Sequence, residues 1–206
     1  MSAPTLKALV HTMRHEADGI VSVEFRPATA GVSFPAFAAG SHIDLHLANG
    51  LVRSYSLCNP CSDSGRYVVG VLNDRASRGG SKFVHQQLRV GQVIDISAPR
   101  NNFELHEDAP RSVLVAGGIG VTPIFCMLQR LVALGRPVEL VYCARTRKEA
   151  AFVEPITALA AEAKVPVTWH FDDEQGGPPK LAQLLEGRGA DSHFYCCGPT
   201  PMLDAF

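Results

Sequence analysis

The sequence lacks the long apolar segment that a transmembrane helix requires, because glycine and proline interrupt its apolar runs. It also lacks a basic excess. Its 19 Lys and Arg against 20 Asp and Glu give a net charge of −1, which recommends neither nucleic acid nor a membrane surface as a partner. Residues 1–19 contain no apolar core of the kind found in a secretory signal, so we expect a cytoplasmic protein.

Spacing typical of a metal site is scarce among the six cysteines. Cys58 and Cys61 have C-x-x-C spacing, but no second such pair and no suitably spaced pair of histidines accompanies them. We therefore predict no metal site in this chain. Other cysteines lie within apolar runs and are interpreted as small core residues: Cys126, Cys143 and Cys196.

The 206 residues, 46% hydrophobic and 19% charged, suffice for one large or two modest domains. Up to about residue 107, apolar and polar residues alternate at period two between turns rich in Gly, Pro, Asn and Asp. This pattern predicts an antiparallel β-barrel with a hairpin turn at Asn49–Gly50 and one short helix over 81–88. The expected strands are 5–13, 20–27, 42–48, 52–57, 66–72 and 92–97.

From about residue 108, apolar strands alternate with segments of helical period, which predicts an α/β domain with a doubly wound parallel sheet. The last helix has no stop signal before Phe206, so we expect this domain to be truncated in that helix. The expected domains are 1–107 and 108–206. The expected strands of the second are 112–118, 138–144, 165–171 and 192–197, and its helices are 122–135, 154–163, 179–186 and one beginning near 199.

The run "GGIGVTP" closes the first strand of the second domain and opens its first helix. Gly118 and Gly120 would let the backbone approach a pyrophosphate, Thr122 offers a hydroxyl, and the helix N-terminus attracts the anion. Pro123 suits a first helical turn. A tight turn without a ligand is the alternative, but the strand–turn–helix context favours dinucleotide binding.

The acidic residue that commonly binds ribose about 20 residues further on is missing, and Arg145 stands near that place. Asp172 and Asp173 follow the third strand, where they could bind ribose hydroxyls or form a solvated loop. The run "CCGP" follows the last strand at the same edge of the sheet. There Cys197 would face the reacting groups or be a buried thiol, and the turn residues beside it are Gly198 and Pro199.

Two runs in the first domain suggest an anion site: "RSYSLC" on a strand and "RGGSKF" before the short helix. Arg53 offers a fixed fork of donors for phosphate oxygens, Ser54 adds a hydroxyl, and Tyr55 offers a flat face and a phenol. The second run places N–H groups at a helix start, which would complete the site, through Gly79, Gly80 and Ser81. We predict a bound phosphate. An amphipathic edge strand is the alternative.

Together, "RSYSLCN", "RGGS", "GGIGVTP" and "YCCGPTPM" resemble, in this order, the ferredoxin–NADP reductase superfamily, and its phthalate dioxygenase reductase branch with the vanillate O-demethylase reductases in particular. The resemblance covers nearly the whole chain. It implies FMN on the barrel and NADH on the α/β domain. It also implies that Ser56 lies near the flavin N5 atom and that backbone lines the ring at Val71, Leu72 and Asn73.

Members of that branch carry a 2Fe–2S domain after the nucleotide domain, but its C-x4-C-x2-C pattern does not occur in these residues. The resemblance implies an oxidoreductase that passes electrons from NADH through FMN to a 2Fe–2S centre and on to an oxygenase or demethylase component. In such an enzyme the protein acts mainly by placement, with Ser56 and Cys197 positioning the reacting groups.

Two other functions remain open: a stand-alone flavin reductase or haem-reductase-type enzyme, and a non-catalytic flavin redox sensor. NADH is expected over NADPH, because three carboxylates near the ribose site balance three cations and leave no positive excess for a second phosphate. These residues are Asp172, Asp173, Glu174, Arg145, Arg147 and Lys148.

Overall fold

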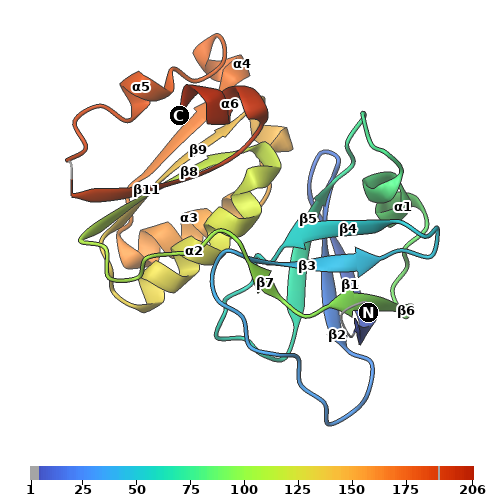
Figure 1. Cartoon of the computed structure of the whole chain (residues 1–206). Coiled ribbons are helices and arrows are strands. Elements are labelled where there is room, and N and C mark those ends of the chain that lie inside the picture. Colours follow the sequence, from blue (N-terminus) through green and yellow to red (C-terminus); the bar gives the residue numbers. More distant parts are fainter. Residues whose placement is uncertain (1–4, 190) are drawn as a thin grey trace. The chain divides into compact units, whose positions relative to one another are not determined.

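Antiparallel and parallel strands separate cleanly along the chain, and the division falls between Glu104 and Leu105 (Figure 1). The computed structural model describes residues 5–189 and 191–206. Residues 1–4, which belong to the first expected domain, lie outside the described residues. The expected domain boundary was placed after residue 107. What each unit binds remains a prediction.

The first unit is an antiparallel sheet with the order β4-β3-β6-β1-β2-β5, and β7 pairs with β3. A bridge between Leu57, which follows β4, and Val69 in β5 joins the two ends of this order. The prediction of an antiparallel β-barrel is thus confirmed. The strands are β1 (Thr5–Ala17), β2 (Ile20–Pro27), β3 (Ser41–His46), β4 (Val52–Ser56), β5 (Tyr67–Leu72), β6 (Val93–Ser97) and β7 (Arg100–Asn101).

Alternate residues of these strands turn inward and form the barrel core, as the period-two pattern requires. The buried members include Val23, Phe25, Ile43, Leu45, Val69 and Ile96. Helix α1 (Gly80–Gln86) contributes Val84 to this cluster. The packing explains why a helix of only seven residues persists: its apolar face is buried against the barrel.

Local departures from the expected strands have physical causes. Strand β1 continues to Ala17, beyond its expected end at residue 13. The sequence did not show this, because irregularities in its pairing with β2 at Val10/Thr12 and His15/Ala17 shift the alternation of apolar and polar residues. The Asn49–Gly50 hairpin is confirmed, but it is a longer loop over 47–51, since His46 and Val52 are the last paired residues. Strand β7 is too short to show any period.

The second unit is a parallel sheet with the order β10-β9-β8-β11, which confirms the predicted α/β domain. In Figure 1, α2 and α3 lie on one face of this sheet, and α5 and α6 lie on the other. The strands are β8 (Arg111–Gly117), β9 (Val138–Ala144), β10 (Val167–Phe171) and β11 (Ser192–Cys197). The helices are α2 (Val121–Ala133), α3 (Val153–Ala163), α4 (Asp172–Gln175), α5 (Leu181–Leu184) and α6 (Thr200–Ala205), with short 3₁₀ turns at Gly118–Gly120 and Arg147–Glu149.

The strand order places a topological switch point between β8 and β11. The chain proceeds from β8 outward through β9 to β10 and then returns to the other side of β8 for β11. In open α/β sheets, ligands bind beside the carboxyl ends of the strands at such a point. The two glycine-containing turns identified in the sequence follow β8 and β11, so the topology brings both to this place.

Two details of the second unit differ from what the sequence suggested. Asp172 and Asp173, for which a solvated loop was the alternative to ribose binding, open the short helix α4, which a four-residue polar run could not reveal by its period. The helix expected over 179–186 is reduced to Leu181–Leu184. Gly177 and the two prolines that precede this helix disfavour helical backbone, so the helix does not extend further toward the N-terminus.

Candidate functional site

The side chains of Arg53 and Tyr55 are on the face of β4 that is turned toward the barrel core. The register pairs Tyr55 with Ile43 and Arg53 with Leu45, and both partners are fully buried. Tyr55 packs against the core cluster. Its burial raises the pKa of its phenol, although Arg53 opposes this shift, so the hydroxyl remains protonated near neutral pH. It can therefore donate a hydrogen bond to an anion.

The Arg53 side chain lies over the first residue of α1. Its Nη1 donates to the Val52 carbonyl at 2.8 Å and its Nη2 to the Arg78 carbonyl at 3.1 Å. A Cβ on Gly80 would lie 2.5 Å from the Arg53 Cγ and 2.7 Å from its Nε, so only glycine fits beneath this side chain. The preceding Gly79 has φ of 92°, a left-handed backbone conformation that glycine adopts without steric cost. The sequence predicted that these residues meet, and the structure brings them together.

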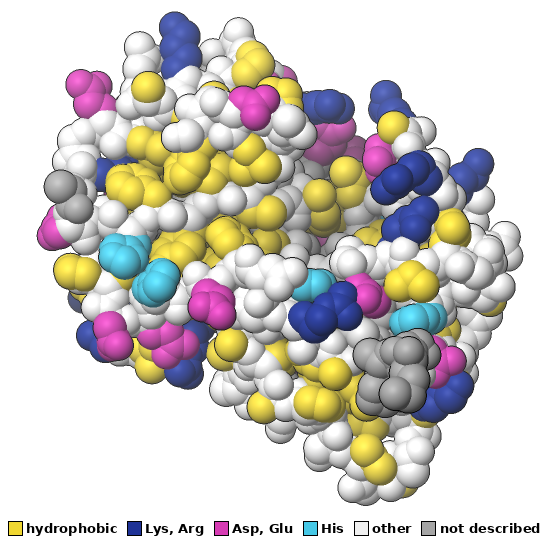
Figure 2. Space-filling model, viewed as in Figure 1, with side chains coloured by type: hydrophobic (Ala, Val, Ile, Leu, Met, Phe, Trp, Pro, Cys, Tyr) yellow, Lys and Arg dark blue, Asp and Glu magenta, His cyan; other side chains and the backbone are white. Residues whose placement is uncertain are grey.

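Further cations lie on the segment that Arg53 contacts. Figure 2 shows Lys and Arg side chains gathered over α1 and the loop that precedes it, where Arg75, Arg78 and Lys82 are exposed and outnumber Asp74. Ser81, in the first turn of α1, donates its hydroxyl to Ser77 at 2.9 Å, and the hydroxyl of Ser77 accepts from the Gly79 N–H at 3.1 Å. The Ser81 hydroxyl is therefore engaged with the loop, while the excess of cations gives this segment a positive charge.

The structure corrects the interpretation of Ser54. Its hydroxyl donates to Asp44 Oδ1 at 2.6 Å, and the other oxygen of that carboxylate accepts from Arg100 at 2.6 Å. Burial would raise the pKa of Asp44, but these two donors hold it below its usual value, so the carboxylate stays charged. Alternation turns Ser54 to the face opposite Arg53. An ionised carboxylate there repels a phosphate, and we do not retain Ser54 as a ligand.

Ser56 shares the face of Ser54 and lies opposite His42 at the end of β4. At the end of β5, the carbonyl of Val71 is near His85 Nε2 at 2.9 Å, and the N–H of Asn73, the residue after the strand, donates to Gly19 at 2.7 Å. The Leu72 carbonyl accepts from the Asp74 N–H at 2.9 Å. These backbone groups are already engaged, but the Leu72 side chain is available, because 37% of the residue is exposed.

In the second unit, the glycine turn after β8 is a 3₁₀ turn that runs directly into α2. Gly118 has φ of 52°, and a side chain there would meet open space. Thr122 donates its hydroxyl to the Ile119 carbonyl at 3.0 Å, so this donor serves the turn itself. Pro123 is buried in the first turn of α2, as its missing N–H allows.

Gly120 has a structural role that the sequence did not reveal. A Cβ on this residue would overlap the carbonyl group of Cys197 and lie 2.8 Å from the Gly198 nitrogen. Gly117 likewise has Pro199 Cδ at 2.9 Å and Gly198 Cα at 3.2 Å from the position of a Cβ. The missing side chains therefore allow the turns after β8 and β11 to pack backbone against backbone.

Sequence reasoning missed residues that hold these turns. The Sδ of Met202 would overlap a Cβ on Gly117 and lie 2.7 Å from one on Gly198, and nothing in the sequence signalled this contact. The buried hydroxyl of Tyr142 donates to the Ala151 carbonyl at 3.1 Å and lies 3.4 Å from the Gly118 carbonyl. A tyrosine inside the apolar run "VELVYCA" was a usable signal, because a buried phenol needs a partner.

The carboxyl ends of β9 and β10 carry the charged residues expected near a ribose. The N–H of Asp173 donates to the Arg145 carbonyl at 3.1 Å, which ties the two strand ends together. The Arg147 guanidinium lies over the Phe171 ring at 4.4 Å and donates to both Glu174 oxygens, at 3.2 and 3.4 Å. Sequence reasoning named Arg147 and Glu174 but did not identify Phe171.

Asp172 Oδ1 lies 3.5 Å from His170 Nε2, which is also 2.9 Å from the Gly177 carbonyl. The cysteines at the neighbouring strand end are partly buried. Burial raises the pKa of the Cys197 thiol, and burial together with Cys197 raises that of Cys196 to about 11. Both are protonated at neutral pH and are poor nucleophiles.

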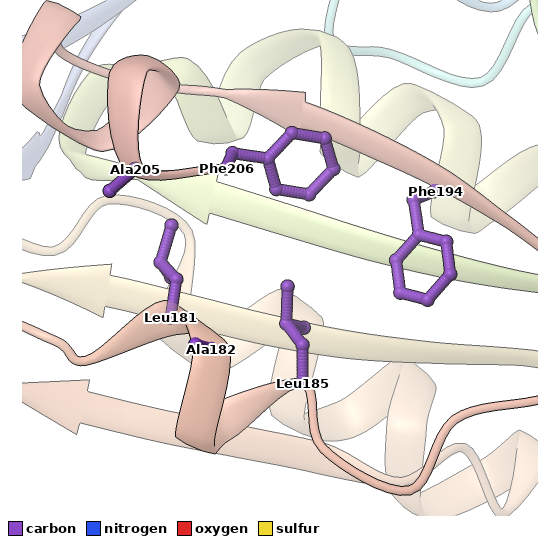
Figure 3. A pocket seen from close by; sticks show the side chains of 6 residues that line it. All are labelled: Leu181, Ala182, Leu185, Phe194, Ala205 and Phe206. Atoms are coloured by element: carbon purple, nitrogen blue, oxygen red, sulfur yellow. The ribbon is translucent and has the colours of Figure 1, made fainter.

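The same unit carries an apolar groove of about 420 Å³ (Figure 3). The side chains that line it are all apolar and offer no catalytic group: Leu181, Ala182, Leu185, Phe194, Ala205 and Phe206. Over residues 5–189 and 191–206, no group of three or more His, Cys, Asp or Glu side chains is arranged to hold a metal ion. Within the same ranges, every helix is too short or too polar to cross a membrane.

Comparison with known proteins identifies the second unit. The family described as "Oxidoreductase NAD-binding domain" matches residues 114–206. The chain is 48% identical over 203 residues to a tetrachlorobenzoquinone reductase of Sphingobium chlorophenolicum, covering 98% of this chain and 62% of the relative. It is 46% identical over 198 residues to a vanillate O-demethylase oxidoreductase of Pseudomonas sp. strain HR199, covering 94% of this chain and 61% of the relative.

Solved structures agree over the whole chain. Phthalate dioxygenase reductase, described as a modular structure for electron transfer from pyridine nucleotides to [2Fe-2S], matches with a TM-score of 0.89 and 33% identity, covering 97% of this chain and 62% of that one. An intact type IV self-sufficient cytochrome P450 monooxygenase matches with a TM-score of 0.90 and 36% identity, covering 98% of this chain and 26% of that one. The chain spans about three fifths of the length of the two curated relatives named above.

The glycine contacts predict different costs for two substitutions in the turn after β8. Gly120→Ala should lower the free energy of unfolding of the second unit by about 3 kcal/mol or more, because the new Cβ overlaps backbone that cannot rotate away. Gly118→Ala should cost only about 1–2 kcal/mol, the penalty of left-handed backbone. Denaturant unfolding followed by the fluorescence of Trp169, the only tryptophan, reports on this unit. Equal costs would show that the turns do not pack as described.

The raised thiol pKa values predict slow alkylation. With a pKa of about 11, only about one Cys196 thiol in a thousand is ionised at pH 8. The rate of reaction of Cys196 with iodoacetamide should rise about tenfold per pH unit between about pH 8 and 10. Peptide mass spectrometry measures this, with free cysteine as the reference. Alkylation of Cys196 at pH 7 as fast as that of free cysteine would contradict the burial argument.

Proposed function

Because the chain belongs to the ferredoxin reductase-like family, in the branch of phthalate dioxygenase reductase and the vanillate O-demethylase reductases, we propose that it binds FMN and NADH as the reductase part of an oxygenase or demethylase system. Electrons from NADH would reach the oxygenase component through an iron–sulfur domain. The observation that carries the proposal is the Arg53 side chain held over Gly80 and bonded to the carbonyl of Arg78, in a segment with an excess of cations.

This place fits a flavin phosphate by its donor set. A guanidinium has five N–H donors, and Arg53 uses two of its nitrogens on the Val52 and Arg78 carbonyls. Those bonds fix the direction of the side chain and leave donors for an anion. Tyr55, on the same face of β4, stays protonated and can add a phenolic donor. A terminal phosphate bound here favours FMN, because no adenine needs to be accommodated beyond it.

NADH would occupy the switch point between β8 and β11. The backbone of the turn at Gly118–Gly120 is uncovered on the side where a Cβ of Gly118 would point, so a pyrophosphate can approach it. Cys197 ends the neighbouring strand as a neutral thiol, which suits a positioning role and not covalent chemistry. A bound flavin accepts two electrons as a hydride and can release them one at a time, as an iron–sulfur acceptor requires.

Placement is the catalytic contribution that this chain can make. Holding two reactants in the right geometry removes much of the entropic barrier, and a hydride moves without a strong acid or base. We propose that Ser56, at the end of β4, donates its hydroxyl to the flavin ring and that Leu72 contacts the ring with its exposed side chain. The Val71 carbonyl and the Asn73 N–H are committed to His85 and Gly19.

Arg53→Ala tests the phosphate site. The loss of one hydrogen bond to a charged group, worth about 1.5–3 kcal/mol, should weaken FMN binding by about 10- to 150-fold. Arg89→Ala is the matched control, because Arg89 also lies beside α1 and donates to two backbone carbonyls, those of Leu88 and Gln86. Titration of the apoprotein with FMN gives both dissociation constants. An unchanged constant for Arg53→Ala would remove the proposed site, and tighter binding of FAD than of FMN would remove the FMN assignment.

Mixing the FMN-loaded protein with NADH in the absence of oxygen tests the reaction. The flavin absorbance should bleach with the formation of one NAD⁺ per flavin, because the two substrates exchange one hydride. A non-catalytic flavin sensor would keep its absorbance although flavin is bound. Reduced protein should then pass electrons to a separately supplied 2Fe–2S ferredoxin. Failure of that second step alone would favour a stand-alone flavin reductase.

A further inference from the structure

We propose that the ion pair between Arg147 and Glu174, laid over Phe171, makes this chain reject a 2′-phosphorylated nucleotide and so sets its preference for NADH. The proposal rests on the nucleotide site proposed above. It goes further, because it names the residues that discriminate between the two coenzymes. It also assigns the decisive role to Glu174, a carboxylate that would not itself touch NADH.

The pair stands where the adenine-side ribose is expected. In dinucleotide-binding folds the end of the second strand approaches the ribose, and an acid there accepts its 2′-hydroxyl, while a nearby arginine accommodates a 2′-phosphate. Here the second strand, β9, ends beside Arg145 and the 3₁₀ turn that begins at Arg147. By residue type alone, this is the arrangement of an NADPH enzyme.

The geometry removes Arg147 from that role. Its Nε and Nη2 donate to the two oxygens of Glu174 at 3.2 and 3.4 Å, in the fork arrangement that would otherwise bind a phosphate. The flat guanidinium also lies 4.4 Å above the ring of Phe171, which is fully buried and cannot follow a moving partner. To reach a 2′-phosphate, Arg147 would have to give up both contacts.

Glu174 adds a second obstacle. A carboxylate beside the guanidinium would face the incoming phosphate with a like charge. The backbone segments that carry the two residues are tied together, because the Asp173 N–H donates to the Arg145 carbonyl at 3.1 Å. Thr146 also accepts from the Glu149 N–H at 3.3 Å and so caps the turn that carries Arg147. The pair therefore joins two strand ends whose backbones are already linked.

Stability does not explain the pair. The side chains of Arg147 and Glu174 are 57% and 43% exposed, and ion pairs at that exposure contribute little to folding. Substituting Glu174 should therefore leave the unit folded. The variant then reports on binding alone.

The test compares 5′-AMP with adenosine 2′,5′-bisphosphate, which differ only in the 2′-phosphate. Trp169 lies on β10 with its ring centroid 6.1 Å from that of Phe171, so its fluorescence reports binding at this place without any flavin. In Glu174→Ala, the affinity for the bisphosphate should rise about tenfold relative to the unchanged protein, because one charge-assisted hydrogen bond becomes possible. The affinity for 5′-AMP should stay within about twofold.

Two further variants isolate the guanidinium. Glu174→Ala combined with Arg147→Ala removes the same carboxylate and its repulsion but should lose most of the gain, since no guanidinium remains to bind the phosphate. Asp108→Asn removes a carboxylate paired with Arg136 at 2.8 Å, before the N-terminal ends of β8 and β9, and should leave both affinities unchanged. In the FMN-loaded protein, Glu174→Ala should raise kcat/KM for NADPH and not for NADH.

The outcomes separate this inference from the proposed function. If 5′-AMP binds but Glu174→Ala gains nothing for the bisphosphate, the inference is wrong and the nucleotide site stands. The same holds if the double variant keeps the whole gain, because loss of the Glu174 repulsion alone would then explain it. If neither nucleotide nor NADH binds, the nucleotide site itself is wrong and the inference falls with it.

Discussion

The carbonyl group of Cys197 occupies the space into which any side chain on Gly120 would project, and the nucleotide half of the chain depends on this contact. It brings the turn after β8 against the turn after β11, on the two sides of the switch point in the sheet. Met202 fills the space beside Gly117 and Gly198. The backbone of both turns can therefore face one ligand, because side chains that would hold the strand ends apart are missing.

The same constraint acts in the barrel. Gly80 opens α1, where a glycine costs about 1 kcal/mol relative to alanine in helix propensity. The sequence accepts this cost at the place where the Arg53 stem passes over the helix start. Gly80 therefore gives up helix propensity at the place where the Arg53 stem needs room. The two units thus use one device, a glycine that allows another group to approach the backbone.

The sequence was informative wherever a period or a turn residue was decisive. Alternation identified the barrel strands, and "GGIGVTP" identified the turn after β8. Contacts that depend on strand register could not be predicted from the sequence. Only the pairing of β3 with β4 shows that the Ser54 side chain bonds to Asp44, on the face opposite Arg53. Short polar helices such as α4 also cannot be predicted from hydrophobic periodicity, because they are too short to show a period. For Gly120, the residue type was predictable and its reason was not, because the carbonyl of Cys197 reaches it from a strand 77 residues further along the chain.

Burial keeps the side chains around both candidate sites neutral. It raises the pKa of Tyr55, of Cys196 and of Cys197, so each carries its proton at pH 7. Such groups can orient a ligand by donating hydrogen bonds, but they are poor bases and poor nucleophiles there. The positive charge at each candidate site comes instead from an arginine: Arg53 is bonded to backbone carbonyls, and Arg147 to a carboxylate. That division of roles suits hydride transfer, in which the protein holds anionic cofactors in place and need not move a proton in the rate-setting step.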